Sequence, residues 1–249
     1  STKNIQTVTL PTTLVDLPYA TPGYNGFTSA QKLTAINVAT GNPNFKSDGG
    51  VVFTNNGKEL VVYPCGKGSS TLGYDLYTYE VPATVEKIRP CAFAHVEGFT
   101  SVKMSSPLKE IGEDAFNACR YLKTVTIPST VNKIADGAFS GSIKLTAINV
   151  ESGNTTYSSA DGVLYNAAQT ELVSYPAGKQ GPYTTLPTTK TIRTRAFYYA
   201  AGITKLTLTP GVEEIGNDAF QQTHNLKELV FQPTSTFKKM GTWAFVGSG

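Results

Sequence analysis

Apolar residues recur along this chain at a regular interval, and the clearest marker of the interval is an Ala-Phe pair. Neighbouring pairs are 23 residues apart, with a longer gap in mid-chain and 25 residues before the last, and they begin at Ala92, Ala115, Ala138, Ala196, Ala219 and Ala244. Such a period is typical of stacked coils that contact only their neighbours. Each Phe should therefore stack on the Phe of the next coil, and we interpret these rings as core.

The unit at residues 122–144, LKTVTIPSTVNKIADGAFSGSIK, shows how one coil is built. Its first half alternates apolar and polar residues, which predicts a half-buried strand that ends at Pro128 because proline lacks the N–H of a continuing ladder. In the preceding unit, Ala115, Phe116 and Cys119 have the i, i+1, i+4 spacing of one face of a helical turn. Each coil is therefore predicted to contain a strand, a corner and a short helical turn.

A longer repeat is superimposed on the short one. Residues 33–67 return as residues 145–179 with an offset of 112 positions, and both copies begin with LTAINV. Each copy passes from the usual strand into a Gly- and Asn-rich turn and then into a predicted hairpin. In the first copy Val51–Phe53 would pair with Leu60–Tyr63, closed by Asn55-Asn56-Gly57, where positive φ is easily adopted.

The two copies organise the chain as one domain. We interpret residues 1–249 as a single solenoid with a modified N-terminal coil at 1–32, a first superrepeat at 33–144 and a second at 145–249. The next strand would begin where the sequence stops, and solenoids normally cover such an edge. The second superrepeat therefore either caps itself or is truncated at its C-terminal end.

The composition indicates a folded protein with a weakly charged surface. Hydrophobic residues make up 40% of the chain, enough for a continuous core, and charged residues only 16%. The 21 basic and 18 acidic residues leave a net charge of +3 without runs of either sign, so we expect no nucleic-acid partner. No stretch approaches the roughly 18 apolar residues of a membrane-spanning helix, so we expect no transmembrane segment in this chain.

Residues that could carry chemistry do not converge in the sequence. His95 and His224 have no partner in a catalytic motif, and the Gly-Lys pair at Gly66 lacks the spacing of a phosphate loop. Three cysteines form no CxxC motif, which suggests neither a disulfide framework nor a zinc site. Cys91 is left open as a reactive thiol. We expect no catalytic residue, no metal and no cofactor.

Three segments carry a family resemblance: IGEDAFNAC at 111–119, IGNDAFQQT at 215–223 and the insert GVLYNAAQTELVSYPAGK at 162–179. They resemble the BspA-like bacterial leucine-rich repeats, and the resemblance covers nearly the whole chain from about Ile5. It implies an α/β repeat fold, a β-rich leucine-rich-repeat solenoid with a parallel sheet on its concave side, short helical turns on the other side and two β-hairpin inserts. It also implies a secreted or surface-attached protein of host-associated bacteria, in a family whose better-known members are described as adhesins.

The strand residues that alternate outward should line one continuous concave surface, the default binding face of such a fold. These candidate binding residues are Thr78, Glu80, Ser101, Lys103, Thr124, Thr126, Asn149, Lys205, Thr207 and Glu228. Their Thr-rich character is equally what good sheet formers facing water would give, and the two interpretations stay open.

We therefore expect a non-enzymatic extracellular or cell-surface recognition protein. Its partner would be a protein, and the resemblance favours a surface protein of the host or of a neighbouring cell. Two alternatives remain: a structural spacer that presents another domain, and a glycan-binding module. The glycan-binding alternative would use aromatic residues of a loop, Tyr74, Tyr77 and Tyr79.

Overall fold

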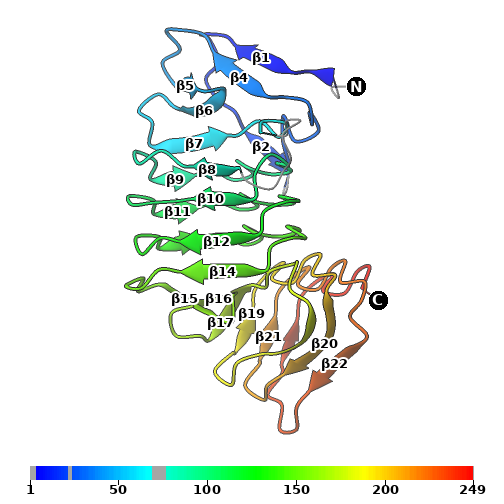
Figure 1. Ribbon diagram of the computed structural model, residues 1–249. Coiled ribbons are helices and arrows are strands. Elements are labelled where there is room, and N and C mark those ends of the chain that lie inside the picture. The colour runs from blue at the N-terminus through cyan, green and yellow to red at the C-terminus, as the bar shows by residue number, and fades with distance from the viewer. Residues whose placement is uncertain (1–3, 22–23, 69–76, 249) are drawn as a thin grey trace.

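The computed structural model describes residues 4–21, 24–68 and 77–248, which fold into a solenoid of strands and turns. The coils form two stacks that run in different directions (Figure 1). Coils of the first stack follow one another downward from the N-terminal end, whereas those of the second follow one another sideways toward the C-terminal end. The solenoid therefore turns a corner, a feature that the repeat pattern did not predict.

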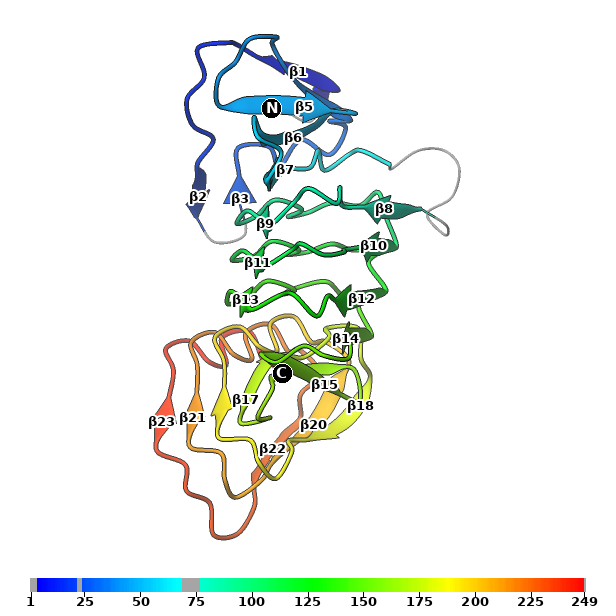
Figure 2. The ribbon, with the colours of Figure 1, turned by 90° about the vertical axis from the view of Figure 1, so that its left-hand side faces the viewer.

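Each coil of the first stack contributes a strand to each of two parallel sheets, which lie on different sides of the stack (Figure 2). One sheet contains β8 (Thr78–Glu80), β10 (Ser101–Lys103), β12 (Thr124–Ile127) and β14 (Ala147–Val150). The other includes the two-residue strands β9 (Lys87–Ile88), β11 (Glu110–Ile111) and β13 (Lys133–Ile134). Val102, Val125 and Ile148 pair in register and are buried, as the alternation predicts.

The second stack is built in the same way. One parallel sheet contains β18 (Gly181–Thr184), β20 (Ile203–Leu208) and β22 (Glu228–Phe231), and the other includes β19 (Thr191–Ile192), β21 (Glu214–Ile215) and β23 (Lys239–Met240). At the N-terminal end β1 (Thr7–Leu10) pairs in parallel with β4 (Ala35–Val38). A small antiparallel pair, β2 (Tyr19–Thr21) and β3 (Tyr24–Asn25), lies beside the start of the first stack (Figure 2).

Each superrepeat carries an antiparallel meander. The meanders comprise β5 (Phe45–Asp48), β6 (Val51–Thr54) and β7 (Glu59–Val62), and β15 (Tyr157–Ala160), β16 (Val163–Asn166) and β17 (Glu171–Ser174). The predicted hairpin is confirmed as the pairing of β6 with β7, but the prediction missed the strand before it. Gly50 closes that extra turn with φ +79°, and a Cβ at Gly50 would lie 2.7 Å from the Cβ of Ala35.

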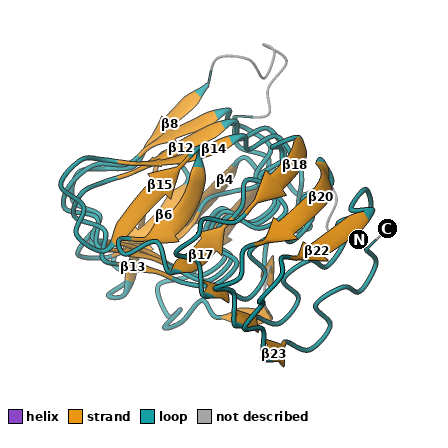
Figure 3. Ribbon diagram, turned by 90° about the horizontal axis from the view of Figure 1, so that it is seen from below, coloured by secondary structure: helices purple, strands orange, loops and turns teal. Residues whose placement is uncertain are grey.

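The predicted helical turns are wrong, because the described residues contain no α-helix (Figure 3). In the Ala-Phe turn, alternate N–H groups leave their own coil: Phe93 donates to the carbonyl of Ala115 at 2.8 Å, and His95 to that of Asn117 at 2.8 Å. The residues just before Ala and two after Phe have positive φ, 55° at Cys91 and 61° at His95. A right-handed helix allows neither feature, and the i, i+1, i+4 spacing fitted both structures.

The predicted spine of stacked rings is confirmed. Phe93 stacks on Phe116 at 4.8 Å between centroids, and Phe197 packs on Phe220 at 5.0 Å. Tyr63 and Tyr175, from the ends of the two meanders, extend the two spines. All these rings are buried, so they contribute to the core and offer no surface to a ligand.

Ion pairs, one of them buried, join the second stack to the first. The guanidinium of Arg195 donates to the carboxylates of Asp114 and Glu113, each at 2.5 Å, although the partners are 81 and 82 positions apart in the sequence. Side-chain exposure is 11% for Arg195 and 0% for Asp114. Arg193 adds a pair with Asp136 at 2.6 Å. These contacts fix the corner of the solenoid.

Replacement of Arg195 should therefore cost stability. Arg195→Met removes the guanidinium from the buried carboxylate of Asp114, and we expect the free energy of unfolding to fall by about 3 kcal/mol. Urea denaturation followed by circular dichroism measures this. The matched control, Lys103→Met, breaks an exposed pair with Glu80 and should cost less than about 1 kcal/mol. Equal losses in the two variants would show that Arg195 does not fix the corner.

Candidate functional site

The structure places the predicted binding residues on two separate sheets. Thr78, Glu80, Ser101, Lys103, Thr124, Thr126 and Asn149 lie on the β8, β10, β12 and β14 sheet, and Lys205, Thr207 and Glu228 lie on the β18, β20 and β22 sheet. The prediction of one continuous surface is wrong, because the chain turns at the β15 to β17 meander and the second stack runs across the first (Figure 1).

Several of these side chains already bind one another. Lys103 lies opposite Glu80 in register and pairs with it at 3.3 Å, and Lys205 pairs with Glu228 at 3.0 Å. The hydroxyls of Thr78 and Ser101 share a hydrogen bond of 2.6 Å. Cross-strand pairs of this kind stabilise the sheet and use groups that a ligand would otherwise engage. The binding role of these residues stays a prediction.

The opposite sheet of the first stack neutralises its charges in the same way. Glu59, Lys87, Glu110 and Lys133 occupy successive register positions with alternating sign. Burial acts to raise the pKa of Glu110, but hydrogen bonds and charges from Lys133 and Lys87 outweigh it, so the pKa lies below its ordinary value. Both sheet faces therefore present paired charges.

A cleft of different character lies in the inner corner, where the Ala-Phe turns of the two stacks meet. This corner cleft has a volume of about 740 Å³, within the roughly 300–1,000 Å³ of small-molecule sites. Its first-stack wall includes His95, Asn117, Arg120, Gly141 and Ile143. Its second-stack wall includes Tyr198, Tyr199, Asn217, Asp218, Gln221 and Trp243, and Tyr24 of β3 also lines it.

Aromatic rings are exposed at several points of the corner cleft. Trp243 is 67% exposed, Tyr24 52% and Tyr199 38%. The ring of Tyr24 packs on that of His95 with 5.3 Å between centroids, which extends the aromatic surface toward the N-terminal segment. Tyr199 and Trp243 both have φ of 56°. Tyr199 lies in the left-handed position two residues after the Phe of its turn, and Trp243 in the one just before the Ala of its turn. The turn geometry that stacks the coils therefore also presents these rings.

Polar side chains of the corner cleft keep hydrogen-bonding capacity in reserve. Among the described residues, the carboxylate of Asp218 and the amide of Gln221 have no hydrogen bond or ion pair, whereas Asn217 accepts one from the N–H of Thr242 at 2.8 Å. Burial, followed by the neighbouring Tyr199, raises the pKa of Tyr198, so its hydroxyl stays protonated and can donate. The corner cleft can therefore both donate to and accept from a ligand.

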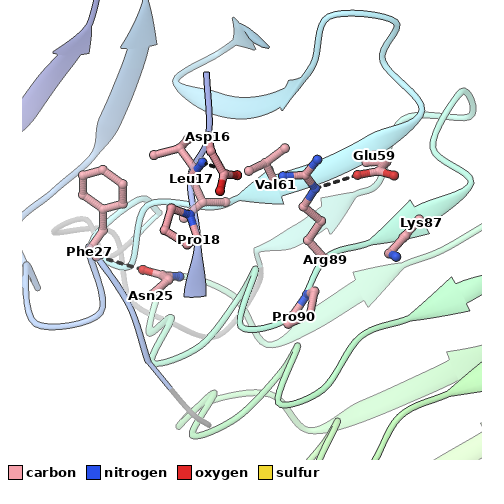
Figure 4. A pocket seen from close by; sticks show the side chains of 12 residues that line it. Asp16, Leu17, Pro18, Asn25, Phe27, Glu59, Val61, Lys87, Arg89 and Pro90 are labelled. Atoms are coloured by element: carbon pink, nitrogen blue, oxygen red, sulfur yellow. Dashed lines mark hydrogen bonds and ion pairs between the residues drawn. The ribbon is translucent and has the colours of Figure 1, made fainter. Parts of the chain in front are cut away.

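A second cavity, of about 760 Å³, lies between the N-terminal segment and strands β7 and β9 (Figure 4). Its polar groups are engaged. Arg89 pairs with Glu59 at 2.6 Å, and Asn25 accepts from the N–H of Phe27 at 2.8 Å while donating to the carbonyl of Cys91 at 2.7 Å. The bond from Asn25 to Cys91 attaches the N-terminal segment to the first stack, so we interpret this cavity as structural.

Other candidates from the sequence fall in the core or outside the described residues. Cys91, left open as a reactive thiol, is fully buried. Burial also raises the pKa of a different thiol, that of Cys65, to about 11. Of the loop aromatics, Tyr77 is 41% exposed, Tyr79 packs on Tyr63 at 4.7 Å, and Tyr74 lies outside the described residues. Within the described ranges, no three His, Cys, Asp or Glu side chains are grouped to hold a metal, and no helix is long and apolar enough to cross a membrane.

Sequence reasoning missed the corner cleft because its walls come from turns far apart in the chain. One signal was present. Tyr199 occupies the left-handed position that Ala118 and Gly141 occupy in the first stack, and Trp243 the one that Asp114 and Gly137 occupy. Large aromatic residues at positions that other coils fill with small ones do not serve the core.

The location of the only tryptophan gives a direct test of the corner cleft. Because Trp243 is largely exposed, the folded protein should emit near the wavelength of the urea-unfolded chain, and acrylamide should quench it almost as well. The matched control is Tyr77→Trp in a Trp243→Phe background, which reports an exposed site outside the cleft. A blue-shifted, protected emission from Trp243 would contradict an open cleft.

Comparison with known proteins places the chain among leucine-rich repeat proteins. The family model described as "BspA type Leucine rich repeat region" matches residues 73–177 and 184–249, in six copies. A comparison with curated proteins gives no match.

Similar solved structures are bacterial leucine-rich repeat proteins. A leucine-rich repeat protein from Eubacterium ventriosum matches 98% of this chain at 18% identity and a TM-score of 0.62. The pneumococcal vaccine antigen PcpA matches 95% at 22% identity and 0.62, and a leucine rich cell surface protein from Faecalibacterium prausnitzii matches 92% at 19% identity and 0.61. The chain covers 59%, 58% and 61% of these structures, respectively. At such identity the likeness shows the fold alone.

Proposed function

This chain belongs to the BspA-type leucine-rich repeat family, and on that premise we propose that it is a non-enzymatic recognition protein of the cell surface or extracellular space. Its partner is a surface protein of the host or of a neighbouring cell, and the solenoid holds that partner in an adhesin-like way. The proposal rests on the family and on the surface of the molecule. The description of PcpA as a vaccine antigen and of the Faecalibacterium protein as a cell surface protein agrees with it.

The corner cleft is the observation that carries this proposal. Recognition needs exposed groups whose interactions are not already satisfied within the protein, and aromatic residues are enriched where binding energy is concentrated. Trp243 and Tyr199 are exposed beside the unengaged side chains of Asp218 and Gln221. On the sheet faces, by contrast, Lys103 and other charged residues are paired with their neighbours. We therefore assign recognition to the corner cleft rather than to the predicted sheet surface.

A structural spacer is the second candidate, and the paired charges favour it. Each coil matches the next through cross-strand pairs such as Lys109 with Glu86 at 3.2 Å and Lys133 with Glu110 at 3.0 Å. A protein that only held another domain away from the cell would need this stacking and no more. The exposed rings of the corner cleft have no role in a spacer.

Cell and matrix binding separates the two candidates. The labelled protein should bind host cells or immobilised matrix proteins, and Tyr199→Ala combined with Trp243→Ala should weaken binding about tenfold or more, since each removes an exposed ring. The matched control replaces Lys103, Lys205 and Glu228 by Ala on the sheet faces and should change binding by less than about threefold. If only the control variant lost binding, the binding site would lie on the sheet faces and not in the corner cleft. A wild-type protein that binds neither cells nor matrix would favour the spacer.

A further inference from the structure

We propose that the group recognised in the corner cleft is a carbohydrate, a short and uncharged oligosaccharide of the kind displayed on cell-surface glycoproteins and glycolipids. This inference rests on the proposed recognition function and names the chemistry of its ligand. It follows from the rings, the hydrogen-bonding groups, the main chain and the charges of the cleft.

The exposed rings suit the faces of sugars. One face of a pyranose ring carries mainly C–H groups, which bear a small positive charge and pack on the negative face of an aromatic ring. Trp243 and Tyr199 offer such surfaces from the third and first Ala-Phe turns of the second stack, and Tyr24 offers one beside His95. Apolar ligands would instead need a closed apolar pocket, whereas these rings remain open to water.

The polar groups suit sugar hydroxyls, each of which both donates and accepts a hydrogen bond. Gln221 can do both through one planar amide, the Asp218 carboxylate accepts, and the protonated hydroxyl of Tyr198 can donate. Neither the Gln221 amide nor the Asp218 carboxylate has a hydrogen bond or ion pair in the described part of the chain. A set that mixes donors and acceptors beside aromatic rings matches the alternating hydroxyls and C–H faces of an oligosaccharide.

The main chain of the cleft walls disfavours an extended peptide. A peptide strand binds by adding to a free sheet edge, whose N–H and C=O groups supply affinity. Here the N–H groups of Phe197 and Tyr199 donate to Ala219 and Gln221 of the next coil, at 2.8 and 3.0 Å. The N–H of Gly141, on the opposite wall, donates to the carbonyl of Tyr198 at 3.3 Å. The ligand must therefore be recognised by side chains.

The charges of the cleft favour a neutral ligand over an acidic one. Its two arginines are already paired: Arg195 with the carboxylates of Asp114 and Glu113 at 2.5 Å, and Arg120 with Glu97 at 3.5 Å. Among the described residues that line the cleft, Asp218 carries a charge with no ion-pair partner, and this carboxylate repels anions. Sialylated and sulfated sugars should accordingly bind more weakly than neutral ones of the same size.

An array of neutral, sialylated and sulfated oligosaccharides tests the inference, with calorimetry on the strongest binder. We expect binding to neutral sugars. Tyr199→Ala and Trp243→Ala should each weaken it about tenfold, which is the loss of roughly one stacking contact. Gln221→Ala should weaken it severalfold. This variant keeps the test open if the aromatic variants fail to fold, because the Gln221 side chain makes no hydrogen bond to the residues that the structure describes. Tyr77→Ala removes an exposed ring outside the cleft and should leave affinity unchanged.

Two results would overturn the inference: no neutral oligosaccharide is bound, or binding is unchanged in all three cleft variants. Cells stripped of their glycans by glycosidases separate this failure from failure of the proposed function. If stripped cells still bind and the double variant Tyr199→Ala with Trp243→Ala does not bind them, recognition through the cleft stands and its ligand is a protein. If neutral sugars bind on the array but no cell is bound, the carbohydrate site stands and the adhesin-like function falls.

Discussion

The hydrogen bonds that leave one Ala-Phe turn for the next are the constraint on which the rest of this structure depends. Alternate N–H groups of each turn donate to the following coil, as Phe116 does to the carbonyl of Ala138 at 2.7 Å. The turn can alternate in this way only because two of its residues adopt positive φ, 51° at Asp114 and 53° at Ala118. The side chain of Phe then points into the core, where the rings stack. The period of the sequence is thus the length of one coil, from one donor of such a hydrogen bond to the equivalent donor in the next turn.

This constraint also explains why the corner produces a cleft. The turn at Gly141 ends the first stack, and its N–H donates across the corner to Tyr198 rather than to a coil directly below. The two ladders of turns therefore face one another, and Arg195 holds them together at the closed end of the angle. A straight solenoid would spread the side chains of successive coils along one surface. The corner instead places them on two opposing walls. The two walls together enclose the corner cleft.

Local patterns predicted what is local in this fold, and failed where the cause lies at long range. Strand alternation, the β6 to β7 hairpin and the aromatic spine were predicted because each depends on residues within one repeat or on the repeat itself. The predicted helical turn was wrong because the spacing of Ala115, Phe116 and Cys119 fits both a helix and the observed turn with two residues at positive φ. The corner was missed because it depends on contacts such as Arg195 to Glu113 over 82 positions. The predicted sheet residues are on strands as expected, but the corner separates them into two faces.

The two superrepeats place their meanders against the preceding coil in the same way. Asn154 donates to the carbonyls of Pro128 and Val131 in the preceding coil, and Asn42 makes the equivalent bonds to Pro11 and Leu14, so the meander meets that coil identically in both copies.

The carbonyls of Cys91 and Arg195, which occupy matching positions, each accept from the side chain of the preceding segment, Asn25 in one copy and Ser140 in the other. In the first superrepeat, however, the N-terminal segment lies against the stack, and the polar groups of the cavity between them are engaged (Figure 4). In the second superrepeat, exposed rings and unengaged polar groups of the described residues line the corner cleft. The same contact between meander and coil thus accompanies two cavities of different character, and the difference lies in the side chains that line them.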